Sequence, residues 1–294
     1  MNLKDKLKGL PSIYYLNLDS RPDKKEYMEI QFDFWKINHT RVSCSKYTPY
    51  NYDEWKNLVV LNPDWDYFQD YFPYDYGEIR YPRYLVEVCF MLTQLETIKN
   101  WLETTDEKYM IIMEDDHDLS MIEYMHFDWE YLMNHIPYDW DVIQFEVANN
   151  VGIPCFLHPT MDRSWTGPLL INRDYAKKII RIHYTTDNKV NFNNKLSSYK
   201  WVHQANNPGV SVDYIISKNG KGYSIPLIYL DPNIGSYDIN LMRKDLPEFF
   251  QHIKDLYHNW WKILRDEYTL EEFFTHGKPN DLILRVDPRF SLLV

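Results

Sequence analysis

The sequence of 294 residues has few glycines, and several common catalytic motifs are missing from it. Its nine glycines are scattered, so it contains neither the GxGxxG dinucleotide fingerprint nor the GxxxxGK[ST] phosphate loop. HExxH and GxSxG are also missing, and the ten histidines show no metal-ligand spacing. The sequence therefore offers no motif-based support for a dinucleotide-binding protein, a P-loop nucleotide-binding protein, a zinc protease or a serine hydrolase.

Cysteines and long apolar runs are also scarce. Cys44, Cys89 and Cys155 are far apart and odd in number, and no CxxC pair occurs, which argues against a disulfide framework or a zinc knuckle. No 18-residue apolar run predicts a membrane helix, and the first residues lack the apolar region of a signal peptide. We therefore expect a soluble, cytoplasmic protein. The composition, rich in Lys, Asn and Tyr, is typical of an AT-rich viral or bacterial genome.

The sequence lacks a block of basic residues, and its formal net charge is −11. This balance argues against nucleic acid as a partner, because phosphate contacts need a basic surface, but it allows a nucleotide bound through a metal ion. Aromatic residues are abundant instead, with 25 Tyr, 14 Phe and 10 Trp. They either fill the core or stack on sugar rings, and composition does not separate the two.

Predicted strands alternate with predicted helices, which indicates an α/β fold. The hydrophobic pattern predicts strands at 12–18, 39–43, 109–113, 140–145, 167–171 and 223–230. It predicts helices at 24–34, 85–103, 127–135, 174–182 and 212–217, with Ser20 or Asp23 as cap of the first. We expect one domain over 1–240 and a helical extension over 241–294 that packs on it through an apolar stripe.

Residues 47–84 mix aromatics, acids and prolines with no steady period. Loops of this length are usually functional, and so many aromatics argue against disorder. We interpret the segment as an insertion or lid. Trp55, Trp65 and Tyr76 are candidates for stacking on an acceptor sugar, with core packing as the alternative for each.

The stretch YMIIMEDDHDLS, residues 109–120, is an apolar run that ends at three adjacent acids. Adjacent carboxylates repel each other, so either water screens them or a positive charge lies beside them. Open α/β sheets bind ligands at the carboxyl ends of their strands. If the extended chain continues, Glu114 and Asp116 face one way and Asp115 the other, and an acid-x-acid pair can bind a hard divalent cation.

Four stretches in order resemble glycosyltransferase family 25, which includes lipopolysaccharide-type glycosyltransferases and procollagen galactosyltransferases. They are IYYLNLDSRPDKK, MIIMEDDHDL, YDWDVIQF and WTGPLLINRDYAKKII. The resemblance covers about residues 12 to 240. It implies a GT-A fold with a mixed nucleotide-binding sheet flanked by helices, a nucleotide-sugar donor such as a UDP-sugar, Mn²⁺ or Mg²⁺ as cofactor, and inversion at the anomeric carbon.

The resemblance also implies roles for individual residues. The metal ligands would come from Glu114, Asp115, Asp116 and Asp238, with Asp116 the foremost. Asp213 would be the general base. Asp213 could instead be an acid favoured by a helix N-terminus, and Asp238 part of an Asx turn. The donor would contact a larger set, namely Asn17, Leu18, Arg21, Thr93, Gln94, Trp165, Thr166 and Gly167.

Thr93 and Gln94 depart from the family, which has Ser and His at the matching positions of its Gly-x-x-x-Ser-His element. Two hypotheses follow: a metal-dependent hexosyltransferase acting on a saccharide or hydroxyl acceptor, or a degenerate transferase-like protein that binds carbohydrate or nucleotide without catalysis. A metal-dependent phosphohydrolase is a third. On the first hypothesis, Asp116→Ala abolishes transfer and leaves the fold intact, because a turn acid contributes little to the core.

Overall fold

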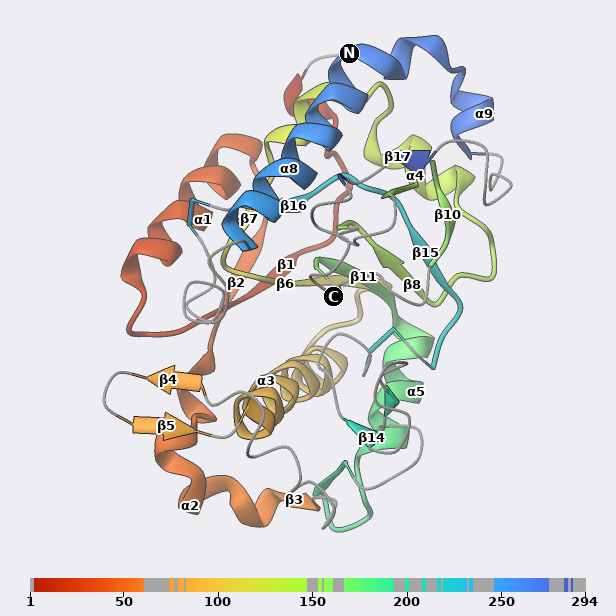
Figure 1. Ribbon diagram of the computed structural model, residues 1–294. Helices are drawn as coiled ribbons and strands as arrows, with labels where there is room; N and C mark the ends of the chain where they lie inside the picture. Colours follow the sequence, from red (N-terminus) through yellow and green to blue (C-terminus); the bar gives the residue numbers. More distant parts are fainter. Residues whose placement is uncertain are drawn as a thin grey trace.

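A computed structural model describes most of the chain (Figure 1). The described residues are 3–60, 74–76, 79–81, 83–146, 153–154, 156–160, 167–192, 199–200, 208–209, 216–217, 219–231, 233–234, 246–274, 283–284 and 287. The helices within them are α1 (Pro22–Trp35), α2 (Tyr52–Trp55), α3 (Arg83–Thr104), α4 (Trp129–His135), α5 (Arg173–His183), α8 (Leu246–Asn259) and α9 (Leu270–Phe274).

A seven-stranded mixed sheet forms the centre of the molecule, in the order β10-β15-β8-β11-β6-β1-β2. Its strands are β1 (Ile13–Asn17), β2 (His39–Ser43), β6 (Tyr109–Glu114), β8 (Val142–Gln144), β10 (His158–Pro159), β11 (Leu169–Asn172) and β15 (Gly222–Ser224). β1 is parallel to both β2 and β6, whereas β11 is antiparallel to its neighbours β6 and β8. The α/β fold class expected from the sequence is therefore confirmed, with a mixed sheet flanked by helices.

Short two- and three-residue strands pair outside this sheet. They are β3 (Val59–Val60) with β12 (Val190–Asn191), β4 (Tyr74–Tyr76) with β5 (Ile79–Tyr81), β7 (His117–Asp118) with β16 (Tyr229–Leu230), β9 (Ile153–Pro154) with β17 (Ile283–Leu284), and β13 (Tyr199–Lys200) with β14 (Pro208–Gly209). The β7–β16 pair matters most for the site, because it ties the segment after β6 to a distant part of the chain.

Both faces of the sheet are buried, because side chains alternate along each strand. In β6, Ile111 and Met113 join the core beneath α1 and α8, while Met110 and Ile112 join the core beneath α3 and α5. Figure 1 shows α1 and α8 on one side of the sheet and α3 and α5 on the other. This two-sided burial explains why the strand reads as a continuous apolar run.

The two neighbours of β1 are reached by connections that run in opposite directions along the sheet. The connection through α1 leads to β2 on one side of β1, and the later connection through α3 leads to β6 on the other side. β1 and β6 therefore flank a topological switch point. In open α/β sheets, ligands bind outside the carboxyl ends of the strands at such a point.

Three local expectations are corrected. α1 begins two residues earlier than expected, with Pro22 in its first turn and no side-chain cap, because proline suits this position. Residues 223–230 do not form one strand: β15 ends at Ser224, and Pro226, which cannot donate a ladder hydrogen bond, separates it from β16. Part of the 47–84 segment is regular, since α2 and two 3₁₀ turns lie between residues 49 and 58.

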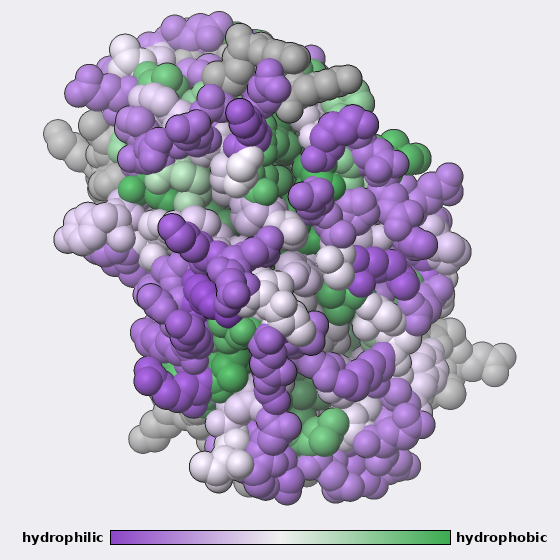
Figure 2. Space-filling view, turned by 180° about the vertical axis from the view of Figure 1, so that it is seen from behind, coloured by the Kyte–Doolittle hydropathy of each residue, from purple (hydrophilic) through white to green (hydrophobic). Residues whose placement is uncertain are grey.

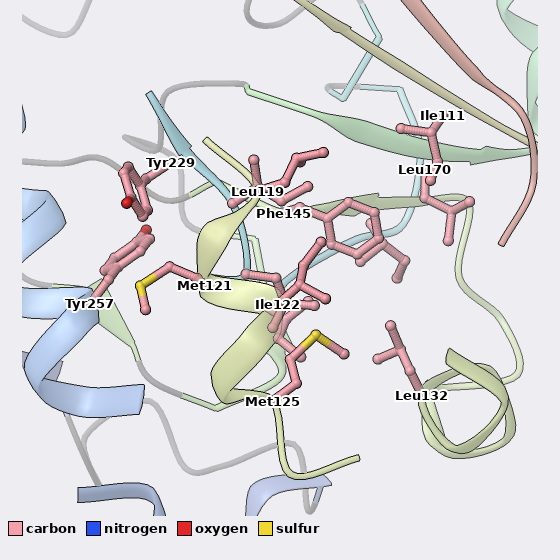
Figure 3. Packing of buried hydrophobic residues seen from close by; sticks show 14 of the residues in the cluster. Ile111, Leu119, Met121, Ile122, Met125, Leu132, Phe145, Leu170, Tyr229 and Tyr257 are labelled. Atoms are coloured by element: carbon pink, nitrogen blue, oxygen red, sulfur yellow. The ribbon is translucent and has the colours of Figure 1, made fainter. Parts of the chain in front are cut away.

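Helix α8 packs into the same core as the sheet. Phe249 and Ile253 of α8, and Trp260 directly after it, are buried in the core that also contains residues of β1. Figure 3 shows Tyr257 of α8 pointing toward Tyr229 of β16, beside Met121. The surface seen from behind is mainly hydrophilic with small apolar patches (Figure 2). Among the helices that the structure describes, none has the length and apolar character needed to cross a membrane.

Candidate functional site

The three acids lie at the switch point, at the carboxyl end of β6. The strand pairs with β1 as far as Glu114, opposite Leu16, and the chain then turns through Asp115 and Asp116. Glu114 is half-buried, whereas Asp115 and Asp116 are buried. The side-chain alternation expected beyond Glu114 is wrong, because the turn directs Asp115 and Asp116 onto one common partner.

That partner is Lys24, in the first turn of α1. Its Nζ lies 3.1 Å from Asp116 Oδ2 and 3.2 Å from Asp115 Oδ1. The Lys24 side chain is only 5% exposed, and those of Asp115 and Asp116 are 12% and 1% exposed. The charge that the adjacent acids require is thus supplied by the chain itself, across more than ninety residues of sequence.

Asn17, the last residue of β1, connects the acids to the β1–α1 turn. Its Nδ2 donates to Asp115 Oδ2 at 2.7 Å and to the Arg21 carbonyl at 3.1 Å. Its Oδ1 accepts from Nε of Arg41 on the neighbouring strand β2, also at 2.7 Å. Asn17 therefore connects the carboxyl ends of β1 and β6 with Arg41 in the middle of β2.

Two partly exposed guanidinium groups flank this end of the sheet. Arg21 pairs with Asp23 at 2.7 Å, and Arg41 pairs with Asp19. Their side chains are 22% and 28% exposed. Each can exchange a surface carboxylate for a phosphate oxygen, since guanidinium groups bind both bidentately. Leu18 contributes its carbonyl, which accepts from the Arg21 backbone N–H at 2.9 Å.

A second buried ion pair extends the network to the end of β8. His117 Nε2 lies 2.9 Å from Glu146 Oε2, and its Nδ1 lies 3.4 Å from Asp116 Oδ1. Glu146 Oε1 also accepts from the backbone N–H of Leu230, on β16. The buried groups Asp115, Lys24, Asp116, His117 and Glu146 thus form a continuous chain from β1 to β8.

Gly167 lies against this network. A Cβ placed there would come within 2.1 Å of Glu146 Oε2 and 2.5 Å of Glu146 Cβ. A larger residue at 167 would displace the carboxylate that holds His117. Glycine at this position therefore allows the close approach of the Glu146 side chain.

The charges in the network shift one another's pKa values. Burial opposes the charged form of Lys24, but Asp116 and Asp115 outweigh it and raise the pKa of Lys24. Burial likewise opposes the ionised form of Asp116, yet Lys24 and His117 hold its pKa below the usual value. The pKa of Asp115 is raised by its burial, which Lys24 and Asn17 offset only in part.

The pKa of His117 is also shifted by its charged neighbours. Burial alone would lower its pKa, but the hydrogen bond and charge of Glu146, together with Asp116, raise it. Protonation of His117 is therefore more favourable than protonation of a histidine in water. In this network Lys24 and His117 face three acids, Asp115, Asp116 and Glu146.

Thr93 and Gln94 occupy the middle of α3. The Thr93 hydroxyl donates to the Cys89 carbonyl at 3.0 Å within the helix, and Thr93 also lines a groove of about 470 Å³ between α3 and β2. The groove has a mixed polar lining that includes Arg41, Lys46 and Lys99, and the acids of residues 114–116 are not part of it. Gln94 Oε1 is buried, with no hydrogen-bond partner in the part of the chain that the structure describes.

The aromatic candidates of the 47–84 segment have different outcomes. Trp55 is 1% exposed, and its indole N–H donates to the Thr48 carbonyl at 2.9 Å. A sugar ring cannot stack on it there, so the structure supports the alternative of core packing. Tyr76 is the last residue of β4 and pairs with Ile79 of β5.

Several predicted site residues lie outside the described residues. They are Trp65, Trp165, Thr166, Asp213 and Asp238. Their assignments to acceptor, donor, base and metal therefore stay predictions from the resemblance.

Sequence reasoning missed four residues of the network, namely Lys24, Arg41, His117 and Glu146. Signals for three of them were present. Lys24 ends the Arg21-x-Asp23-Lys24 turn, His117 follows the acids directly, and Glu146 follows a predicted strand just as the acids do. The rule that polar residues after strand ends gather at one edge would have found Glu146.

A divalent cation fits the buried acids poorly. Mn²⁺ or Mg²⁺ needs several oxygen ligands and open positions for a phosphate. Asp115 and Asp116 already share the Lys24 ammonium, and the other Asp116 oxygen faces His117. Among the described residues, no group of three His, Cys, Asp or Glu side chains is arranged to hold a metal ion.

Comparisons with known protein families and with curated proteins find no match for the sequence. Among solved structures, the crystal structure of A197 from STIV is similar at a TM-score of 0.36 and 9% sequence identity, over 75% of this chain and 84% of that chain. A similarity at this level assigns neither a fold family nor a function.

Proposed function

We propose that the protein is a glycosyltransferase with a GT-A-type domain, which moves a hexose from a nucleotide-sugar, a UDP-sugar in the first place, to a hydroxyl group of a saccharide or other acceptor. The observation that carries the proposal is the convergence of polar side chains at the β1–β6 switch point. The Asn17 side chain binds the Asp115 carboxylate and the Arg21 carbonyl there, and the Arg21 guanidinium pairs with Asp23 beside them, at the edge where open α/β sheets bind nucleotides.

The chemistry of transfer suits such an edge. Cleavage of the bond between sugar and diphosphate builds negative charge on the leaving diphosphate, and fixed positive groups stabilise that charge in the transition state. Arg21 and Arg41 are cations of this kind at the exposed side of the network. We propose that they bind the diphosphate, while Asn17 holds the strand ends on which they depend.

In an inverting transfer, the acceptor hydroxyl attacks the anomeric carbon from the side opposite the diphosphate, and a carboxylate takes the hydroxyl proton. We propose Asp213 for this role, on the resemblance alone. Mn²⁺ or Mg²⁺ is the cofactor that the resemblance implies. Asp115 and Asp116 hold Lys24 and are therefore not free to ligate that ion.

The experiment is a screen of nucleotide-sugars for release of the nucleoside diphosphate, run with Mn²⁺ and with EDTA. Hydrolysis reports the donor before the acceptor is known. Turnover of one donor, weakened by Arg21→Ala but not by Lys25→Ala, would support the proposal. No turnover of any donor under either condition would count against catalysis.

A second candidate is a transferase-like protein that binds nucleotide or carbohydrate without catalysis. The neutralisation of the acids by Lys24 favours it, as does the presence of Thr93 and Gln94 where the family has Ser and His. Binding of a nucleoside diphosphate without turnover of any nucleotide-sugar would select this candidate over the first.

A further inference from the structure

Lys24 occupies the position that a cation would take between Asp115 and Asp116. Its Nζ is almost equidistant from one oxygen of each, at 3.2 and 3.1 Å, and its side chain is 5% exposed. Charge-assisted hydrogen bonds of this kind are the strong ones, and removing one partner of a buried pair is costly. The Lys24 ammonium is thus an integral part of the turn that contains Asp115 and Asp116.

The backbone fixes this arrangement. Lys24 lies in the first turn of α1, and α1 follows β1 after only four residues, Leu18 to Arg21. The Asn17 side chain joins both ends of that connection, since it donates to the Arg21 carbonyl and to Asp115. Lys24 is therefore directed at the acids by the start of its helix.

The remaining oxygens of the two acids face groups of the protein. Asp115 Oδ2 accepts from Asn17. Asp116 Oδ1, which is buried and has no hydrogen-bond partner among the described residues, lies 3.4 Å from His117 Nδ1. Asp116 is 1% exposed. An ion there would have to displace Lys24 and approach the imidazole of His117, and it would lack open positions toward a diphosphate.

We infer that Lys24 stands in for the divalent cation at this acid turn, so that Asp115 and Asp116 organise the nucleotide edge without ligating Mn²⁺ or Mg²⁺. Only the placing of a nucleotide at this edge rests on the proposed function. The acids then act as positioning residues: they hold α1, and through it the Arg21 guanidinium, against the ends of β1 and β6.

The test is a titration with Mn²⁺ alone. Its uptake is measured as the loss of the electron paramagnetic resonance signal of free Mn²⁺. Four proteins are titrated: wild type, Lys24→Ala, Lys24→Ala with Asp116→Asn, and Lys25→Ala. Lys25 is the matched control, because it is the next residue of α1 and pairs with Glu29 on the helix surface. We expect no uptake by wild type or Lys25→Ala, one equivalent by Lys24→Ala, and loss of that uptake in the double variant.

Uptake of one equivalent by wild type that Asp116→Asn abolishes would overturn the inference, and this comparison does not need Lys24→Ala to fold. A folded Lys24→Ala that takes up no Mn²⁺ would also overturn it, because the vacated acids would then not be a cation site. Failure of UDP, GDP and other nucleoside diphosphates to bind in calorimetry counts against the proposed function alone and leaves the Mn²⁺ result standing.

Discussion

Lys24 decides how the acid turn behaves at the scale of single residues. The sequence-based expectation that Asp116 is a turn acid of little importance to the core is wrong, because Asp116 is 1% exposed and pairs with Lys24. Asp116→Ala would therefore lower stability as well as activity, and loss of activity alone would not identify a ligand. Variants of Lys24 separate the two effects better.

Lys24→Met should destabilise the fold by about 3–5 kcal/mol, because it leaves two adjacent carboxylates buried without their cation. Urea unfolding of wild type and variant measures the difference. Lys25→Met is the control, with a change within about 0.5 kcal/mol expected at an exposed site. A Lys24→Met protein as stable as wild type would mean that the ammonium is not buried between the acids.

Gly167→Ala should destabilise by about 1–3 kcal/mol, because the new Cβ would overlap Glu146 and displace its contact with His117. A double-mutant cycle with Glu146→Gly, which removes the carboxylate and also the Cβ that lies 2.5 Å from the new methyl group, tests the cause. Removal of the Glu146 side chain opens the space, so the double variant should lose less than the sum of the two single losses. Strict additivity would show that the two residues do not meet.

The elements of the sheet were largely predictable from the sequence, whereas their contacts were not. Residues 39–43 form the predicted strand, and the helix predicted at 85–103 is α3 with one or two residues added at each end. These elements have strong local periodicity. Lys24 and Asp116 are 92 positions apart, so no local sequence pattern could predict that they pair.

Proline and turn chemistry account for the local errors. Pro22 starts α1 where a side-chain cap was expected, and Pro226 divides one expected strand into β15 and β16. The division has a structural use, because it lets β16 leave the central sheet and pair with β7, beside the acid turn. The Asp231 backbone N–H then donates to the Asp116 carbonyl at 2.7 Å.

α8 is attached to this turn region through Asp118. Lys254 Nζ of α8 lies 3.3 Å from Asp118 Oδ2, and the Tyr229 hydroxyl donates to the same oxygen at 2.9 Å. Burial tends to raise the pKa of Asp118, but hydrogen bonds from Ser120 and the charge of Lys254 outweigh it and hold the pKa below its usual value.

Because the folded pKa of Asp118 is depressed, its ionised form stabilises the fold above about pH 4, and this contribution is lost as the pH falls through the folded pKa. Wild type should exceed Asp118→Asn in stability at neutral pH, and the gap should close below about pH 4. Urea unfolding across this range measures it, with the exposed Asp174→Asn as control. A gap that persists unchanged at the lowest pH would contradict the role of the carboxylate.

On the scale of the whole molecule, the two crossovers from β1 bring together polar residues from four neighbouring strands. Asn17 joins the carboxyl ends of β1 and β6 to Arg41 of β2, and His117 extends the network to Glu146 after β8. The arrangement leaves the buried acids neutralised and the partly exposed cations Arg21 and Arg41 at the edge. The central claim is that this edge binds a nucleoside diphosphate.

Isothermal titration calorimetry of the wild-type protein with a panel of nucleoside diphosphates, in EDTA and in Mn²⁺, tests that claim most directly. We predict that one of them, UDP in the first place, binds with a Kd between about 1 μM and 1 mM, in the range of ordinary enzyme substrates. Arg21→Ala should weaken this binding by about 10- to 100-fold, the value of one charge-assisted contact, whereas Lys25→Ala should not change it. Failure of every nucleotide to bind in both conditions, or equal binding by Arg21→Ala, would contradict the account.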